Sequence, residues 1–397
     1  MSGKRFPLML SFGTIPFWRD VRVLRAVSQV VSAILVVGLV VFIVTQVLAA
    51  ADARGFKLGF DFLQEEAGFP IAESVIEYEE SDTFLYAFGV GILNTLKVAI
   101  SGVILATILG IFVGVCGVST NWLVRRIAMV YVEIFRNVPL LVQLFFWYFG
   151  VFQLLPSVQE SIQWPGPIIL NNRGIYMVWG DPTAAFVPWL VLLLIAVVVA
   201  VVVAIVLSRI ESRVGRSTYP LSVAVAIVVV VPVLAWILMP DSPLMRNAPE
   251  LGRFNYEGGL RLTPEFASLL IGLVVYTAAF IAEVVRGGIN SVRRGQTEAS
   301  RALGLTALQT LRFVVFPQAL RVIIPPLISQ YLNLTKNSSL AIAIGYPDLF
   351  SVGRIMVNQA GRAVPIFLLL MISYLAMSLT YALIGNIYNR RVRFEER

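Results

Sequence analysis

Few residues in this chain are of the types that catalyse reactions or bind metal ions. The sequence has no histidine, which excludes histidine-based metal sites and histidine acid–base catalysis. Its single cysteine, Cys116, lies inside an apolar run, so an internal disulfide framework is also excluded. No phosphate-binding loop of the form G-x-x-x-x-G-K-S/T occurs, and the chain therefore cannot hydrolyse ATP by that route. Its apolar runs hold no paired carboxylates, and we expect the chain not to be an enzyme.

One group of polar residues lies between two apolar segments, from Gly295 to Pro317, in the sequence GQTEASRALGLTALQTLRFVVFP. A charged, amphipathic stretch of this kind must lie in water or at a membrane surface. Its anchors are Glu298, Ala299, Gly304 and Pro317, in the spacing E-A-x, three residues, G, nine residues, and an apolar-x-apolar-P ending. Apolar residues recur from Ala299 onward at roughly helical spacing, which predicts a helix.

That helix is expected to begin near Thr297, with the carboxylate of Glu298 close to the positive end of the helix dipole. A glycine inside a helix costs about 1 kcal/mol relative to alanine. Gly304 is therefore explained if another backbone packs closely against it, or if the helix turns at that point.

Composition places the chain in a membrane. It is 58% hydrophobic and 14% charged, with a mean hydropathy of +0.83, whereas soluble domains carry about 25% charged residues. Several runs reach the roughly 20 apolar residues that a helix needs to cross a bilayer, and long uninterrupted runs predict helices rather than a barrel. We expect an all-α polytopic membrane protein with about eight spans, at Ala26–Ala50, Val98–Val118, Asn137–Leu155, Ala184–Leu207, Tyr219–Met239, Phe266–Ala282, Val322–Gly345 and Ala363–Tyr388.

The charges of the connecting segments predict the orientation. Alternate segments, counted from the N-terminus, have a net charge of +14, and the remaining connecting segments have a net charge of −7. Basic residues are favoured on the cytoplasmic side, so both termini and the 295–317 segment are expected in the cytoplasm. The same pattern explains the overall charge of +8 better than nucleic-acid binding does, because the basic residues lie beside apolar spans.

Polar side chains inside the spans form the second group. Because such groups are costly in hydrocarbon, they should face the bundle interior, a partner subunit or a water-filled path. Hydrogen bonding between helices is the alternative, worth only about 0.6 kcal/mol on average. A path or gate and simple hydrogen bonding both stay open for the cluster around the charged lysine. The candidate path residues are Gln143, Gln330, Asn333, Lys336, Asn337 and Ser338.

Four stretches together resemble one known family. They are YVEIFRNVPLLVQLFFWYFG at 131–150, AEVVRGGINSVRRGQTEAS at 282–300, PQALRVIIPPL at 317–327 and KNSSL at 336–340. The chain is similar to permease subunits of ABC importers for polar amino acids, and the 295–317 segment resembles their EAA loop, with Ser300 in place of the usual alanine. The resemblance implies a type I importer fold, and it implies that the loop docks on an ATPase subunit. The implied coupling residues are Gly295, Gln296, Glu298, Ala299, Gly304 and Pro317.

The resemblance also implies an organisation and a set of partners. Residues 1–85 would hold the N-terminal tail, the first span and an acidic loop, and residues 86–155 and 263–390 the permease core. An insertion at 156–262 would add two peripheral spans. Residues 391–397 would form a cytoplasmic tail. This enlarged layout resembles the long permease of broad-specificity L-amino-acid systems. A separate ATPase dimer would bind ATP and Mg. This chain itself would bind no cofactor. The other expected partners are a second, non-identical permease, an extracytoplasmic substrate-binding protein and the lipid of a bacterial inner membrane.

Two alternatives stay open at the level of sequence. A secondary amino-acid transporter would normally show repeated halves and intramembrane acidic residues; apart from Glu283, at a span end, none is expected here. The 51–83 loop carries nine acidic and two basic residues. It is interpreted as a solvated loop in preference to a docking surface for a basic protein, because charge runs usually mean solubility.

Overall fold

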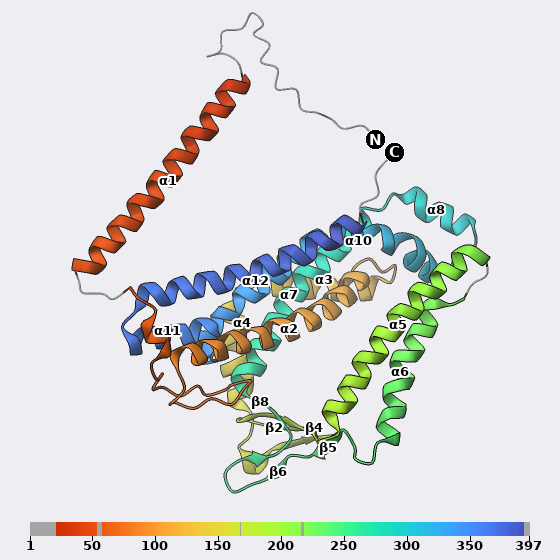
Figure 1. Ribbon diagram of the computed structural model, residues 1–397. Helices are drawn as coiled ribbons and strands as arrows, with labels where there is room; N and C mark the ends of the chain where they lie inside the picture. Colours follow the sequence, from red (N-terminus) through yellow and green to blue (C-terminus); the bar gives the residue numbers. More distant parts are fainter. Residues whose placement is uncertain (1–20, 54–57, 167, 216–217, 393–397) are drawn as a thin grey trace, which may run out of the picture.

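The computed structural model describes residues 21–53, 58–166, 168–215 and 218–392, and helices dominate them (Figure 1). The first six helices are α1 (Val21–Ala53), α2 (Phe84–Cys116), α3 (Trp122–Asn137), α4 (Leu140–Phe145), α5 (Phe186–Val214) and α6 (Pro220–Leu238). The remaining helices are α7 (Pro264–Asn290), α8 (Arg294–Ala302), α9 (Ala307–Thr310), α10 (Phe316–Asn337), α11 (Leu349–Ala360) and α12 (Ala363–Val392). The first 20 residues and most of the expected 391–397 tail lie outside the described residues.

Seven helical segments in the described part of the chain are long and apolar enough to cross a membrane, and a bent pair raises the number to eight. This confirms the polytopic helical fold with about eight spans. The bounds of the third span were wrong. It begins at Trp122 rather than Asn137, and it is broken between α3 and α4 with a bend of 102°. Pro139 causes the break, because proline has no N–H to donate and disfavours a helical residue before it.

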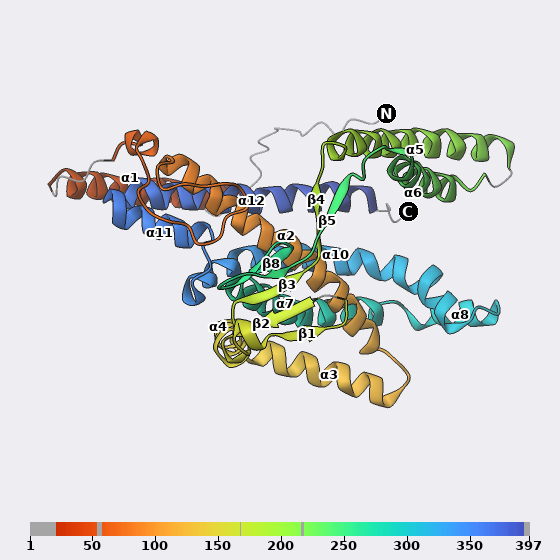
Figure 2. The ribbon, with the colours of Figure 1, turned by 90° about the horizontal axis from the view of Figure 1, so that it is seen from below.

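Helix α7 lies at the centre of the bundle and packs against α2, α3 and α10. Figures 1 and 2 show α8 at one end of this bundle and α11 at the other. Glycines bring α2 and α7 close together. A Cβ atom built on Gly110 would lie 2.5 Å from the side chain of Ile281, and one on Gly114 would lie 2.8 Å from the backbone oxygen of Ala282. Small residues are used in this way where membrane helices approach closely.

The segment 156–262 contains short strands that the sequence did not predict. They are β1 (Ile162–Trp164), β2 (Ile168–Asn171), β3 (Gly174–Met177), β4 (Trp179–Pro182), β5 (Leu244–Asn247), β6 (Glu250–Leu251), β7 (Tyr256–Glu257) and β8 (Leu260–Leu262). An antiparallel sheet has the order β1-β2-β3-β8, with a ribbon of β4 and β5 and a hairpin of β6 and β7 beside it. Because the ribbon leads directly into α5 and out of α6, these two helices pack on each other and lie apart from the bundle (Figure 2).

The described part of the acidic loop, residues 58–83, is folded onto the bundle rather than simply solvated. Phe62 and Phe69 are buried in a cluster with α2, α11 and α12. The carboxylate of Glu73 accepts a hydrogen bond from Nζ of Lys97 at 2.7 Å and another from Oγ1 of Thr263. Apolar contacts and an ion pair thus fix the loop to the bundle, while most of its carboxylates are exposed to solvent: Asp61, Glu65, Glu66, Glu77, Glu79 and Glu80.

Candidate coupling segment and translocation path

The coupling segment is a pair of short helices at one end of the bundle. Helix α8 ends at Ala302, and α9 begins at Ala307 after a turn, with Thr306 and Gln309 forming a reciprocal cap at its start. A π-helical segment, Leu311–Val315, then joins α9 to α10. The expected start of the helix near Thr297 was wrong. The first helix begins earlier, at Arg294, and Glu298 lies in its interior.

Gly304 provides the turn between the two helices. Its φ angle is +78°, in the left-handed region that residues with a side chain rarely adopt. No atom lies within 4 Å of a Cβ built there, so within this chain no backbone packs against it. Of the two explanations that the sequence left open, the structure supports a turn.

Five of the six expected coupling residues lie in α8 or the turn after it, and Pro317 lies in the first turn of α10. All six are exposed: Gly295, Gln296, Glu298, Ala299, Gly304 and Pro317. Ser300 instead points inward, and its hydroxyl bridges the two helices through hydrogen bonds to the Thr297 carbonyl and the Thr310 hydroxyl. The side chains of Leu303 and Leu308 are 81% and 74% exposed. A pair of helices fixed by internal hydrogen bonds, yet carrying uncovered leucines, is suited to docking on another protein.

Five of the six expected path residues lie on or directly after α10. Asn333 and Lys336 are exposed, Gln330 and Asn337 are partly exposed, and Ser338 is buried. Spacings of three and four residues place the first four along one face of the helix. On other faces, the Tyr331 hydroxyl accepts a hydrogen bond from Thr107 of α2, and the Thr335 hydroxyl donates one to Tyr381 of α12. The polar face of α10 is therefore left open after the helix has packed into its own chain.

Gln143, the sixth expected path residue, lies in α4 rather than on α10. It is buried, and its Nε2 donates hydrogen bonds to the backbone oxygens of Phe135 and Val138 at 3.0 and 2.9 Å. These carbonyls lie at the end of α3, where the helix leaves them without intrahelical partners. The side chain of Gln143 therefore holds the α3–α4 bend together, a contact that the sequence alone did not indicate.

Two polar clusters beside the bundle were missed by the sequence interpretation. One joins Glu73, Lys97 and Thr263, as described above. The other surrounds Asp348, which is fully buried and caps α11 by accepting hydrogen bonds from the amide and hydroxyl of Ser351. Burial raises the pKa of the Asp348 carboxyl above its usual range, and the hydrogen bonds from Ser351 oppose that rise. The signal available in the sequence was a lone aspartate directly before an apolar helical stretch.

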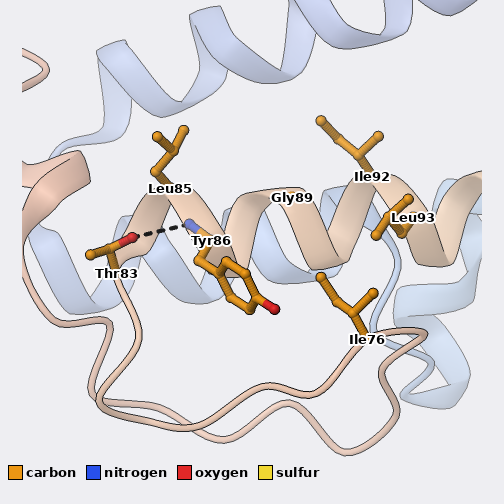
Figure 3. Close-up of a pocket in the computed structure, with 7 residues that line it drawn as sticks. All are labelled: Ile76, Thr83, Leu85, Tyr86, Gly89, Ile92 and Leu93. Atoms are coloured by element: carbon orange, nitrogen blue, oxygen red, sulfur yellow. Dashed lines mark hydrogen bonds between the residues drawn. The ribbon is translucent and has the colours of Figure 1, made fainter.

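A surface groove of about 430 Å³ lies between the 76–83 part of the loop and α2 (Figure 3). Its lining is almost entirely apolar, with Thr83 and Tyr86 as the polar members. Thr83 Oγ1 already accepts from the Tyr86 amide, and the Tyr86 hydroxyl donates to the Glu77 carbonyl. A polar solute would find few partners there, so the groove is not a candidate path. Among the described residues no group of three or more His, Cys, Asp or Glu side chains is placed to hold a metal ion.

Comparison with known proteins gives consistent matches. A family model described as "Binding-protein-dependent transport system inner membrane component" matches residues 196–394. The chain is 43% identical over 373 residues to the "Putative amino-acid ABC transporter permease protein YhdX" of Escherichia coli K12, covering 93% of this chain and 94% of that protein. It is 42% identical to the "General L-amino acid transport system permease protein AapQ" of Rhizobium johnstonii, and the match covers 93% of this chain and 92% of that protein. It is 37% identical to the "Glutamate/glutamine/aspartate/asparagine transport system permease protein BztB" of Rhodobacter capsulatus, and the match covers 95% of this chain and 96% of that protein.

Proposed function

The chain belongs to the family of binding-protein-dependent inner membrane transport components, and from this premise we propose that it forms half of a translocation path for polar L-amino acids. It is the non-catalytic permease subunit of an ATP-binding cassette importer, and ATP hydrolysis takes place on a separate subunit. The observation that carries the proposal is identity of 37–43% with three amino-acid permeases over more than nine-tenths of each chain. The same matches leave the secondary-transporter alternative without support.

The exposed α8–α9 pair supports the proposal that the coupling segment docks on the ATPase. Uncovered Leu303 and Leu308, next to Glu298 and Ala299, offer an apolar surface with a charged edge. Such a surface on a helix pair that is already fixed internally transmits motion to α10, because α9 continues into α10 through the π-helical segment. ATP and Mg would be bound by that partner.

The open polar face of α10 supports the proposal of a second permease. Gln330, Asn333, Lys336 and Asn337 have to be shielded from lipid, and this chain does not cover them. A facing subunit would close the path around them, with Ser338 at its end. We expect that subunit to be non-identical, since the strands, α5 and α6 of the 156–262 insertion enlarge one side of this chain.

The charge asymmetry supports a placement with both termini and α8 in the cytoplasm and α11, the strands and the 58–83 loop outside. Correcting the third span moves the charged residues Arg125, Arg126, Glu133 and Arg136 from a loop into α3. Their combined charge is +2, so the net charge of the cytoplasmic segments falls from +14 to +12 and the asymmetry keeps its sign.

The experiment that tests the function is affinity purification from native membranes, combined with uptake of radiolabelled L-amino acids by cells with and without the chain. We expect an ATPase and a second permease to co-purify, and uptake of polar amino acids to be lost in the deletion strain. Purification of the chain without an ATPase, or unchanged uptake, would contradict the proposal. Recovery with the ATPase but no other permease would contradict only the non-identical partner.

A further inference from the structure

The broken third span carries a guanidinium deep into the membrane. Arg126 and Arg136 lie near opposite ends of α3, ten residues apart, which is about 15 Å along a helix that rises 1.5 Å per residue. The hydrocarbon core is only about 30 Å thick. Phe280 of α7, which the side chain of Arg136 contacts, lies ten residues before the end of its own span at Asn290, so the guanidinium lies about 15 Å inside that span along the helix.

The side chain of Arg136 lies against α7. The carbon of its guanidinium is 5.1 Å from the centre of the Phe280 ring. Glu283 follows Phe280 by three residues and so lies on the same face of α7. The carboxylate of Glu283 binds the guanidinium of Arg286 at 2.5 and 3.0 Å, and it also interacts electrostatically with Arg136. The structure gives Arg136 no ion pair within the described residues.

This group of side chains therefore has two cations and one anion, and it is accessible. The side chains of Arg286 and Glu283 are 41% and 35% exposed, and Arg136 and its neighbour Asn137 are exposed as well. An exposed charge at this depth is too costly to face lipid. The surface around Arg136 must face water or a polar partner, and in a permease subunit that condition is met by the translocation path.

We propose that Arg136 and Glu283 form a binding station in the path for the zwitterion of an α-amino acid. The guanidinium of Arg136 takes the α-carboxylate, because its planar N–H groups match the two carboxylate oxygens and its charge has no anion of its own. The carboxylate of Glu283 takes the α-ammonium group on the other side. The ligand's carboxylate gives Arg136 the anion that this chain does not supply, while the zwitterion as a whole leaves the net charge of the group unchanged. The inference rests on the proposed function and names the part of the substrate that all polar amino acids share.

The test is equilibrium binding of radiolabelled L-glutamine to the purified permease–ATPase complex without its soluble binding protein. The wild-type complex should bind L-glutamine, and neither L-glutamine α-amide nor N-acetyl-L-glutamine should compete. Arg136→Gln should weaken binding about tenfold or more, the loss expected for one charge-assisted hydrogen-bonded contact. Arg136→Lys, which keeps the charge without the planar fork, should weaken it less. Arg126→Gln, on the same helix but outside the group, is the matched control and should bind as wild type.

A second measurement does not depend on affinity. In a Cys116→Ser background, Asn137→Cys should react with a charged, water-soluble thiol reagent, and L-glutamine should slow that reaction. Four outcomes would each overturn the binding station. The first two are a complex that imports L-glutamine without binding it and an Arg136→Gln variant that binds as wild type. The others are competition by either analogue and an Asn137→Cys variant that does not react. A wild-type complex that imports no amino acid at all would instead overturn the proposed function.

Discussion

At the scale of single residues, Gly304 shows how a backbone conformation can require a glycine at one position of the coupling segment. Its φ of +78° forms the turn between α8 and α9, and the space around it is open. A side chain is therefore excluded by conformation and not by crowding within this chain. Asparagine tolerates the left-handed region, whereas a β-branched residue does not.

We expect Gly304→Asn to keep most ATPase retention and amino-acid uptake, and Gly304→Val to lose both. The left-handed conformation costs a residue with a side chain about 1–2 kcal/mol, and valine would also tilt α8 away from its docking position. Co-purification of the ATPase and uptake at matched expression measure the difference. Equal loss in both variants would mean that a partner backbone packs on Gly304 and that the turn is not the reason for the glycine.

Asp348 belongs to the same scale. Its carboxyl is buried, and its pKa is raised above the usual value chiefly by that burial. A raised pKa means that the folded protein binds the proton more tightly than the unfolded chain. The stabilising contribution is therefore fully present below the usual pKa of an aspartate and is lost as the pH rises through the raised value.

Asp348→Asn should keep the cap on α11, because asparagine also accepts from the Ser351 amide, while it removes the titration. We expect the melting temperature of the variant, relative to wild type, to increase as the pH rises from 4 to 7 in detergent or nanodiscs. A difference that stays constant over this range would show that the carboxyl does not titrate there. Glu65→Gln, at an exposed carboxylate of the loop, serves as the control for general surface charge.

At the scale of elements, the sequence predicted the apolar helices and missed the polar ones. Helix α6 is uniformly apolar and was found within a residue of its bounds, whereas α5 continues past the predicted end at Leu207 into a charged last turn. Helix α3 was missed because Arg125, Arg126 and Arg136, which lie together on its polar face, interrupt the apolar run in the sequence. The strands were missed because they have only two to four residues each, and because two of the pairings, β4 with β5 and β3 with β8, join segments more than 60 residues apart. Local patterns do not record pairing of that kind.

The candidate site was also predicted in part: the coupling residues were found, and the contacts of the polar residues within the spans were not. The coupling residues were found as a group, because their spacing is a property of one continuous segment. Gln143 was grouped with the α10 residues because both are polar within apolar runs, yet its amide holds the α3–α4 bend. Only coordinates distinguish a polar side chain that faces an opening from one that satisfies a helix end.

The α5–α6 hairpin gives a prediction at this scale. The two helices pack on each other, and most of their large apolar side chains are exposed. We expect replacement of residues 183–243 by a two-residue Asn-Gly turn, closing β4 onto β5, to leave the substrate range unchanged. Stability or pairing with the second permease should fall first. Uptake competition with a panel of amino acids and recovery of the complex measure the two effects, and a changed substrate range in a well-assembled complex would contradict the expectation.

At the scale of the whole molecule, the placement in the membrane is the property that the sequence predicted with fewest assumptions. Reporter fusions at Ser81, Asn172 and Asn255 should read as outside, and a fusion at Gln309 as inside. Asn172 and Asn255 lie in turns next to short strands, where insertions are usually tolerated. A cytoplasmic readout at Asn172 would overturn both the number of spans and the orientation.

The ribbon of β4 and β5 has a consequence for how such a chain changes over evolutionary time. Pro182 and Leu244 are directly paired partners, so the polypeptide leaves the ribbon and returns to it at neighbouring positions. The entropy of closing a loop between two such points grows only slowly with its length, by about 0.6 kcal/mol for each doubling. A whole pair of membrane spans can therefore be gained, lost or exchanged at this junction at little conformational cost to the bundle. The size of the subunit and the identity of its neighbours are free to diverge between lineages while the transport machinery stays the same.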